Sequence, residues 1–282
     1  MHKFILFFYF ILPLQMLAET LSRPILSEPQ FQLLEAEETQ IQITKIFQDK
    51  YGFLWLGSAH GLLKYDGYQV TKIIAGPGKN DLSHNYISDI VDDESGNLWI
   101  STYGGGLNKY DQKKESFIQF KDHDKKDDIS TDVLWDIEKS NDSKLWIGSR
   151  NWLNKFDIAR HKNQKISPDT EPALNIDNNI WTLLQDSKNN LWIGTLGEGI
   201  YRYSDDGSLK QYFHNADSKN ALSNNLVRSI LEDESGNIWI ATDDGLNVLD
   251  VETNTFKYFN HSPDDNHSLS SNEINKVFRD SK

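Results

Sequence analysis

Short apolar segments separated by polar turns recur along the chain at nearly constant spacing. The clearest unit, ESGNLWISTYGGGLNKYD (94–111), reads as a turn, an apolar strand, a glycine turn and a second strand. The same phrase surrounds five tryptophans that lie 44, 47, 46 and 47 residues apart, namely Trp55, Trp99, Trp146, Trp192 and Trp239. A period of roughly 40–50 residues with short strands is typical of a β-propeller, in which each repeat forms one four-stranded blade.

The repeat sets a register that divides every blade into strands. An inner strand is expected about a dozen residues before each tryptophan, at 43–47, 87–91, 134–138, 180–184, 227–231 and 274–278. Fourth strands rich in aromatic residues are expected at 116–120, 209–213 and 255–259. Residues 30–34 resemble a fourth strand with no blade before it. We therefore predict an all-β propeller over residues 30–282, with five whole blades and the start of a sixth. The ring would be incomplete because the sequence is truncated at its C-terminus.

The amino terminus has the pattern of an export signal. A basic start, Met1–Lys3, precedes an unbroken apolar run, Phe4–Leu12, and Ala18 offers a small residue at a cleavage point. The run is too short for a membrane span, which needs about 20 apolar residues. We predict a signal peptide at 1–18 and a polar lead-in at 19–29, with an uncleaved amino-terminal anchor as the alternative. In both cases the rest of the chain would be periplasmic.

The composition argues against several function classes. A formal net charge of −13 without a Lys/Arg cluster would repel phosphate backbones, so we expect no nucleic-acid partner. The chain has no cysteine, which rules out disulfides, a thiol nucleophile and a lipoprotein anchor. Its histidines are not paired at metal-ligand spacing, and no phosphate-binding loop or nucleophile elbow is present. We expect no metal, no cofactor and no catalytic residue in this region.

Several repeats carry a longer motif of the form D-x-x-G-x-L-W-I-G-T-x-x-G-L-x-x-Y-D. It is recognisable in QDKYGFLWLGSAHGLLKYDGY, DDESGNLWISTYGGGLNKYD and EDESGNIWIATDDGLNVLD, and inner strands follow phrases such as LSHNYISDI. In these motifs the chain resembles the two-component regulator propeller family over about residues 30–282. The third repeat departs from the pattern, with Trp152 where other repeats have glycine.

The resemblance implies a periplasmic sensor of a membrane-spanning signalling protein. In such a protein a transmembrane helix follows downstream, and then a histidine kinase or a diguanylate cyclase. The full-length protein would contact the membrane only through those downstream segments, and it could act as a homodimer.

Residues that recur in every repeat are best explained by structure. The five repeat tryptophans are expected to fill the wedge between neighbouring blades. An Asn or Asp at one shared register position before the inner strands is expected to cap the turn into each strand. These residues are Asn85, Asp132, Asn178, Asn225 and Asn272.

Positions that differ between repeats are better candidates for binding. At the register eleven residues before each tryptophan, near the mouth of the central channel, the chain has Thr44, Ser88, Trp135, Trp181, Arg228 and Asn275. Trp135 and Trp181, on adjacent blades, are predicted to form a platform for a sugar or aromatic ring, with Arg228 as the anchor for an anionic group. Tyr103 and Arg150, in loops on the same side, would form the rim. We predict a sensor region without enzymatic activity that binds a small molecule or oligosaccharide here.

The sequence leaves three alternatives open. Trp135 and Trp181 would bind no ligand if both merely fill contacts between blades. A secreted propeller enzyme, a lyase or hydrolase, would need a histidine and a carboxylate at the channel mouth. His60 with Asp243 or Glu198 is the candidate for that pair. A protein-interaction scaffold would need neither a pocket nor such a pair.

Overall fold

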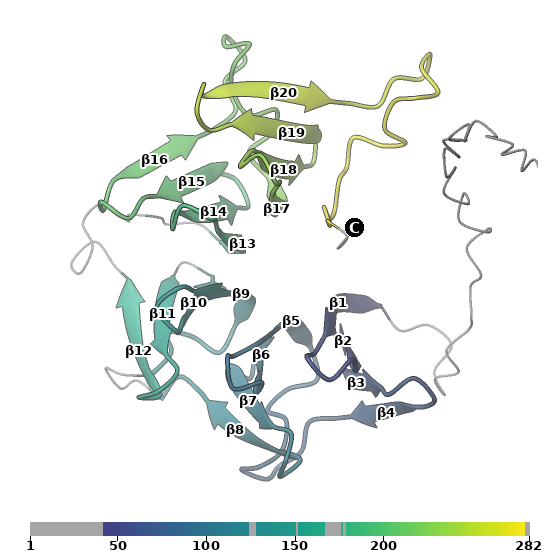
Figure 1. The fold of residues 1–282 in the computed structure, drawn as a ribbon, viewed down its shortest axis with the longest axis vertical. Helices are drawn as coiled ribbons and strands as arrows, with labels where there is room; N and C mark the ends of the chain where they lie inside the picture. The colour runs from purple at the N-terminus through teal and green to yellow at the C-terminus, as the bar shows by residue number, and fades with distance from the viewer. Residues whose placement is uncertain (1–41, 124–127, 151, 167–175, 177–178, 280–282) are drawn as a thin grey trace, which may run out of the picture. The chain divides into compact units, whose positions relative to one another are not determined.

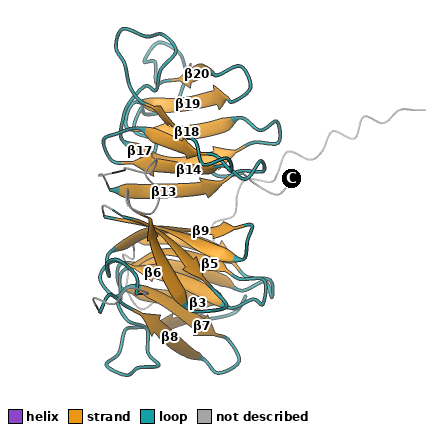
Figure 2. Cartoon of the chain, turned by 90° about the vertical axis from the view of Figure 1, so that its left-hand side faces the viewer, coloured by secondary structure: helices purple, strands orange, loops and turns teal. Residues whose placement is uncertain are grey.

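The computed structural model describes residues 42–123, 128–150, 152–166, 176 and 179–279. The predicted signal peptide, the lead-in, the candidate strand at 30–34 and Asn178 lie outside these residues. The described residues form twenty β-strands and no helix, so this part of the chain contains no helix that could span a membrane (Figure 2). The predicted all-β class is confirmed.

The strands form five antiparallel sheets of four, and consecutive strands are neighbours in each sheet. We call these sheets blades 1 to 5, and each blade takes four strands in chain order. The strands are β1 (Ile43–Gln48), β2 (Leu54–Ser58), β3 (Gly61–Tyr65), β4 (Val70–Ile73), β5 (Ile87–Asp92), β6 (Leu98–Thr102), β7 (Leu107–Asp111), β8 (Ser116–Phe120), β9 (Leu134–Ser140), β10 (Lys144–Ser149), β11 (Leu153–Asp157), β12 (Lys162–Ile166), β13 (Ile180–Gln185), β14 (Leu191–Thr195), β15 (Ile200–Tyr203), β16 (Leu209–Tyr212), β17 (Val227–Glu232), β18 (Ile238–Thr242), β19 (Gly245–Asp250) and β20 (Thr255–Phe259).

The blades follow one another around a common centre, with the first strand of each blade innermost and the fourth outermost (Figure 1). Neighbouring inner strands contact each other in the order β1, β5, β9, β13 and β17. This is the blade arrangement of a β-propeller, in which one sequence repeat supplies one radial sheet. Five of the predicted inner strands and all three predicted fourth strands are observed within one or two residues of their expected bounds. The fourth strands β4 and β12 had no sequence prediction.

Apolar side chains gather in four layers, each between two consecutive blades. The repeat tryptophans contribute to these layers: Trp55, Trp99 and Trp192 are completely buried, and Trp146 is 6% exposed. Trp239 belongs to blade 5, beyond which no further blade is described, and it is partly exposed. The predicted burial is therefore confirmed for four tryptophans and holds in part for the fifth.

An aspartate six residues before the tryptophan closes the turn that leads into the second strand. In blade 2 the indole N–H of Trp99 donates to Asp93 Oδ2 over 3.0 Å, and the backbone N–H of Asn97 donates to Asp93 Oδ1 over 2.9 Å. Burial opposes the ionisation of Asp93, but the hydrogen bonds from Asn97 and Trp99 keep its pKa below the usual value. The same indole bond, of 2.9, 2.8 and 2.9 Å, joins Trp55 to Asp49, Trp192 to Asp186 and Trp239 to Asp233.

The Asn and Asp residues before the inner strands bond to the backbone across a blade boundary. Asn85 Oδ1 accepts from the N–H of Ala75, and Asn225 Oδ1 accepts from the N–H of His214, both over 2.7 Å. Each donor follows the fourth strand of the preceding blade. These side chains therefore clamp the crossing between blades, whereas the sequence predicted a cap on the turn into the inner strand.

The predicted inner strand of a sixth blade is not a strand. Residues 274–278 have no regular secondary structure, although they follow blade 5. Ile274 N–H donates to Thr242 O over 3.1 Å, and Val277 N–H donates to Ser229 Oγ over 3.4 Å. Periodicity identifies where an inner strand would lie, but a strand also requires a second strand to complete its ladder. The two bonds described for this segment go to a carbonyl at the end of β18 and to a serine side chain, so they do not form a ladder.

Candidate ligand-binding site

Each inner strand begins with a bulge, and the bulged residue is the one that varies between blades. The register of β13 against β14 shifts between Ile180 and Thr182, which leaves Trp181 without a partner in the ladder. The same kind of shift leaves out Thr44, Ser88, Trp135 and Arg228 in the other blades. A bulge re-aims a side chain that would otherwise follow the alternation of the strand. These five side chains are therefore not part of the regular alternation that fills the apolar layers between blades.

Four aromatic rings form a continuous row across blades 2, 3 and 4. The ring centroids are 5.5 Å apart for Tyr86 and Tyr103, 4.8 Å for Tyr103 and Trp135, and 4.6 Å for Trp135 and Trp181. We call these four residues the aromatic row. Both tryptophans are partly buried, and Tyr103 is 42% exposed. The row therefore leaves ring surface open to solvent.

Backbone contacts hold the aromatic row in place. Tyr103 opens the turn between β6 and β7, where its N–H donates to Tyr86 O over 3.0 Å and its backbone bridges to Val133. This turn thus bonds both to the segment that precedes β5 of its own blade and to the segment that precedes β9 of blade 3. The indole N–H of Trp135 is shielded from solvent and has no acceptor among the described residues. A shielded donor of this kind costs free energy until an acceptor is supplied.

The two predicted arginines differ in their surroundings. Arg228 pairs with Asp243 of the β18–β19 turn through two N–H groups, one of which spans 3.0 Å from Nη2 to Oδ2. Arg150 is exposed in the β10–β11 turn. The structure therefore stacks Tyr103, Trp135 and Trp181 on one another and holds the charge of Arg228 in an ion pair. Tyr86 was not predicted, because it stands before the inner strand, outside the register positions that were compared.

A second set of polar residues, also not predicted, occupies the innermost strands ten residues before each tryptophan. Lys45 pairs with Asp89, whose Oδ2 accepts from the N–H of Ile137 on β9 over 3.2 Å. Asp136 Oδ2 in turn accepts from the N–H of Leu183 on β13 over 2.6 Å. These carboxylates tie β1 to β5, β5 to β9 and β9 to β13. The available signal was a polar residue inside an apolar strand at one register: Lys45, Asp89, Asp136, Thr182, Ser229 and Lys276.

Burial and like charge alter the protonation of these carboxyl groups. Burial, followed by the neighbouring Asp89, raises the pKa of Asp136 well above its usual value. Burial also opposes the ionisation of Asp89, but the charge of Lys45 keeps its pKa low. Burial raises the pKa of Glu138, further along β9, to about 7. Glu138 is thus a carboxyl group of the inner strands that can hold a proton near neutral pH.

Three segments of the chain, residues 81–104, 176–197 and 221–244, match the family model of the two component regulator propeller. Each segment contains an inner strand, the tryptophan strand and part of the turn beyond it. These are two component regulator propeller repeats. The matched regulator propeller repeats form blades 2, 4 and 5, in which an aspartate precedes the tryptophan by six residues. Blade 3, with Ser140 in that place, lies outside the matches.

Several known proteins resemble this chain. The extracellular domain of BT3049 from B. thetaiotaomicron, described as a hybrid two component system, is 25% identical, with a TM-score of 0.61 over 85% of this chain and 37% of that chain. The extracellular domain of BT4673 from the same organism, with the same description, is 22% identical, with a TM-score of 0.58 over 89% of this chain and 37% of that chain. Histidine kinase P4 of Formosa agariphila is 27% identical over 153 residues, which are 52% of this chain and 11% of the kinase. The chain thus spans little more than a third of these solved structures and a far smaller share of the kinase.

An enzyme shares the propeller architecture. Virginiamycin B lyase of Staphylococcus aureus is 11% identical, with a TM-score of 0.58 over 79% of this chain and 75% of the lyase. At that identity the likeness shows the fold alone. In the present chain His60 is exposed, Asp243 pairs with Arg228, and Glu198 accepts from the hydroxyl of Tyr201 over 2.8 Å. Both candidate carboxylates therefore have partners other than His60.

Proposed function

We propose that this chain is the extracytoplasmic, ligand-sensing propeller of a signal transduction protein of the two-component or cyclic-di-GMP type. The support is the regulator propeller repeat, together with neighbours described as extracellular domains of hybrid two component systems. The export signal predicted at 1–18 fits a periplasmic location. In this proposal the region is not itself an enzyme. Histidine kinase or diguanylate cyclase activity belongs to other parts of a full-length protein, which acts as a homodimer.

The aromatic row carries the proposal that a ligand binds at the start of the inner strands. Trp135 and Trp181 stack at 4.6 Å with an interplanar angle of 35°, and the Trp135 N–H lacks a protein acceptor. The same register holds Thr, Ser and Arg in the other described blades, so the rings are not a requirement of the repeat. A ligand would stack on the exposed ring faces, whereas the shielded N–H of Trp135 would reach an acceptor on it only if the ring turned.

The charges around the row favour an uncharged contact. Asp243 neutralises Arg228, so an anionic ligand group would first have to displace this carboxylate. Sugar rings present an apolar face to an aromatic ring and offer oxygens as acceptors at their edge. We therefore assign a small molecule or an oligosaccharide to this site. Tyr103 and the exposed Arg150 form its rim.

The double substitution Trp135→Ala with Trp181→Ala tests the site. A panel of mono- and oligosaccharides is screened against the unmodified protein by thermal shift, and isothermal titration calorimetry then measures the affinity of each hit. The double variant should bind more than roughly tenfold more weakly while it stays folded, because aromatic stacking adds about 1 kcal/mol per ring beyond the buried area. Tyr68→Ala is the matched control, since Tyr68 is 97% exposed in the β3–β4 turn. Unchanged affinity in the double variant would refute this site.

The same ligands test the absence of enzymatic activity. Each compound that binds is incubated with purified protein, and its products are analysed by mass spectrometry. We expect the ligand to be recovered intact. Turnover that is lost in His60→Ala would instead identify a secreted propeller lyase or hydrolase. Capture of a protein partner by a chain that binds no compound would favour the interaction scaffold.

A further inference from the structure

A groove of about 450 Å³ opens between blades 3 and 4, at the far ends of the inner strands from the aromatic row. Trp135 is the second residue of β9 and belongs to the row, whereas Ser140 is its last residue and lines the groove. A volume of this size lies within the range of small-molecule sites in proteins. The groove is therefore a separate candidate site, independent of the function proposed for the row.

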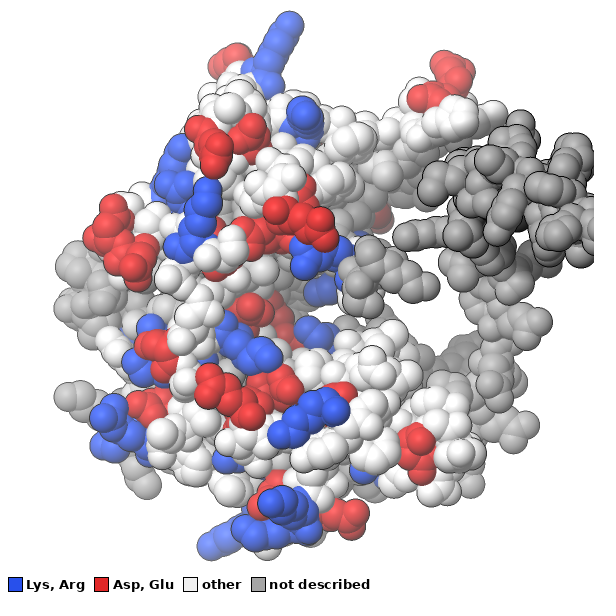
Figure 3. All heavy atoms as spheres, viewed as in Figure 1, with Lys and Arg blue, Asp and Glu red and all other residues white. Residues whose placement is uncertain are grey.

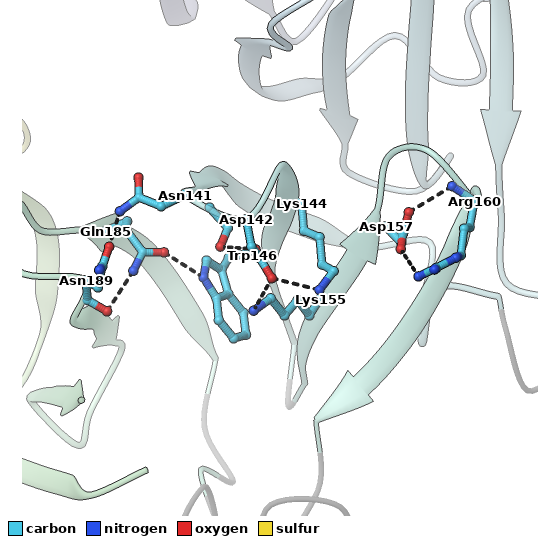
Figure 4. A network of polar contacts seen from close by, with 10 residues as sticks. Asn141, Asp142, Lys144, Trp146, Lys155, Asp157, Arg160, Gln185 and Asn189 are labelled. Atoms are coloured by element: carbon cyan, nitrogen blue, oxygen red, sulfur yellow. Dashed lines mark hydrogen bonds and ion pairs between the residues drawn. The ribbon is translucent and has the colours of Figure 1, made fainter. Parts of the chain in front are cut away.

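The groove exists where blade 3 departs from the repeat. Ser140 stands six residues before Trp146, at the position where the other four blades have an aspartate. Without that carboxylate, the indole N–H of Trp146 reaches across to blade 4 and donates to Gln185 Oε1 over 3.0 Å. Ser140 Oγ itself donates to Asp142 Oδ1 over 2.6 Å, and both residues line the groove next to the Trp146–Gln185 bond (Figure 4).

The blade 3 wall of the groove carries an excess of positive charge. Asp142 Oδ2 lies 2.7 Å from Lys144 Nζ and 3.1 Å from Lys155 Nζ, so two ammonium groups share one carboxylate. Figure 4 shows the ends of both lysines meeting at Asp142. Burial opposes the ionisation of Asp142, but the hydrogen bonds from Lys144, Ser140 and Lys155 hold its pKa well below the usual value. The three charged side chains therefore sum to one positive charge at neutral pH.

The blade 4 wall offers neutral hydrogen-bonding groups and one carboxylate. Gln185 Nε2 donates to Asn189 O over 2.8 Å, and the side chain of Asn141 donates to Asn189 Oδ1. This network fixes the amides next to the groove, and the exposed Asp205 lies on the same wall. On the face of the chain shown in Figure 3, basic and acidic side chains are interspersed. With Asp205 included, the charged side chains that line the groove sum to zero, so the positive charge is confined to the blade 3 wall.

We infer that the groove binds a small polyhydroxylated carboxylate of about the size of one sugar acid. Its carboxylate would lie against Lys144 and Lys155, where it completes the charge balance around Asp142. Its hydroxyl groups would donate to Asp205 and exchange hydrogen bonds with the amides of blade 4. The expected ligand differs from that of the aromatic row, which favours an uncharged contact.

Three sugars that differ mainly in one charged group test this inference. Glucuronate, glucose and glucosamine are titrated into ¹⁵N-labelled protein, and the indole N–H resonance of Trp146, assigned with Trp146→Phe, reports binding at the groove. Glucuronate should produce a saturable shift, and glucose and glucosamine should bind at least roughly tenfold more weakly because they cannot form the charge-assisted bonds. A shift that does not saturate with glucuronate, or equal affinity for the three sugars, would overturn the inference.

Variants separate this groove from the aromatic row. Lys144→Gln with Lys155→Gln should abolish the preference for glucuronate. Lys139→Gln removes another lysine of blade 3, one that pairs with Asp92 of blade 2, and should leave the preference unchanged. Ser140→Asp should restore the repeat aspartate beneath Trp146 and reduce glucuronate binding in a folded protein. The double substitution in the aromatic row should not alter the glucuronate titration. Retention of the preference in the double lysine variant would refute the site.

Discussion

At four of the five repeat tryptophans, the indole N–H ends on an aspartate of its own turn. A large ring fills the wedge between two blades well, but its N–H would have no acceptor in an apolar layer. One aspartate supplies that acceptor and also accepts backbone N–H groups of the turn, as Asp93 does from Asn97. The motif therefore keeps Asp and Trp at a fixed separation. The aspartate closes the turn, and it also provides the hydrogen-bond acceptor that the buried indole N–H requires.

Burial should rank the repeat tryptophans by their contribution to stability. Trp192→Ala should lower the free energy of unfolding by about 3–5 kcal/mol, as other large-to-small core substitutions do. Trp239→Ala should lower it by less, because Trp239 is partly exposed whereas Trp192 is completely buried. Urea unfolding followed by circular dichroism measures both values. Equal losses, or a loss below about 1 kcal/mol for Trp192→Ala, would contradict the role of these rings in the core.

Glu138 should make stability fall as pH rises toward neutrality. Burial raises its pKa from 4.5 to about 7, so the folded state binds this proton more tightly than the unfolded state does. Its stabilising contribution is complete below about pH 4.5 and is lost as pH rises through about 7. Glu138→Gln stays neutral at every pH. Between about pH 5 and about pH 8, the free energy of unfolding of this variant should therefore decrease by roughly 1–3 kcal/mol less than that of the unmodified protein.

Chemical denaturation at the two pH values measures this difference. Glu252→Gln is the control, because that side chain is 83% exposed and its loss should not change the pH dependence. Asp136 is present in all three proteins, so its own titration cancels in the comparison. Parallel pH profiles for the unmodified protein and Glu138→Gln would show that Glu138 does not titrate differently in the folded state.

Among the structural elements, the hairpin between the second and third strands depends on glycine. Gly106 has a φ of +74°, which favours glycine, and its N–H donates to Asp132 O of the next blade over 3.0 Å. A Cβ added there would collide with the carbonyl oxygen of Phe120 and lie 2.8 Å from Ile129 Cδ1. The hairpin can therefore pass close to the neighbouring chain only where no side chain intervenes.

Two alanine substitutions separate backbone strain from this collision. Gly106→Ala and Gly207→Ala both place alanine at positive φ, but nothing lies within 4 Å of a Cβ at Gly207, where φ is +80°. Gly207→Ala should reduce the free energy of unfolding by about 1–2 kcal/mol, the strain of the left-handed region. Gly106→Ala should cost more, because backbone atoms must also move. Thermal unfolding of the two variants measures the difference, and equal effects would show that the hairpin has room for a side chain.

At the scale of the whole molecule, periodicity predicted the features that recur in every blade with the same residue types, and it did not predict features whose residues differ between blades. The spacing of Trp55, Trp99, Trp146 and Trp192 was enough to predict the fold class, five inner strands and buried rings, because each blade solves the same packing problem. The fourth strands β4 and β12, VTKI and KNQKI, escaped notice because they lack the aromatic residues used to find the others. The first blade differs from the second because no described blade packs against the outer side of β1. Ile46 on β1 is 65% exposed, whereas Ile90 at the same register on β5 is completely buried between two blades.

The candidate site was predictable only in part. Comparing one register position between blades identified Trp135 and Trp181, and the bulge explains why that position is free to vary. The stacking of Tyr103 on Trp135 depends on how a turn of blade 2 meets the inner strand of blade 3. The pairing of Arg228 with Asp243 depends on how a turn of blade 5 meets the inner strand of the same blade. Such contacts have no fixed sequence spacing, so the charge partner of Arg228 could not be inferred. The binding role of Arg150, which is exposed in the β10–β11 turn, stays a prediction.

The indole bond of Trp146 crosses a blade boundary, whereas those of the other four repeat tryptophans stay within one blade. Where this bond is internal, a repeat that is duplicated or exchanged by recombination carries the acceptor of its own tryptophan with it. Blade 3 lacks an internal acceptor for its tryptophan, and Gln185 of blade 4 supplies it instead of Ser140. For gene duplication or for the design of chimaeric propellers, the transferable module at this place is the pair of blades 3 and 4, taken together.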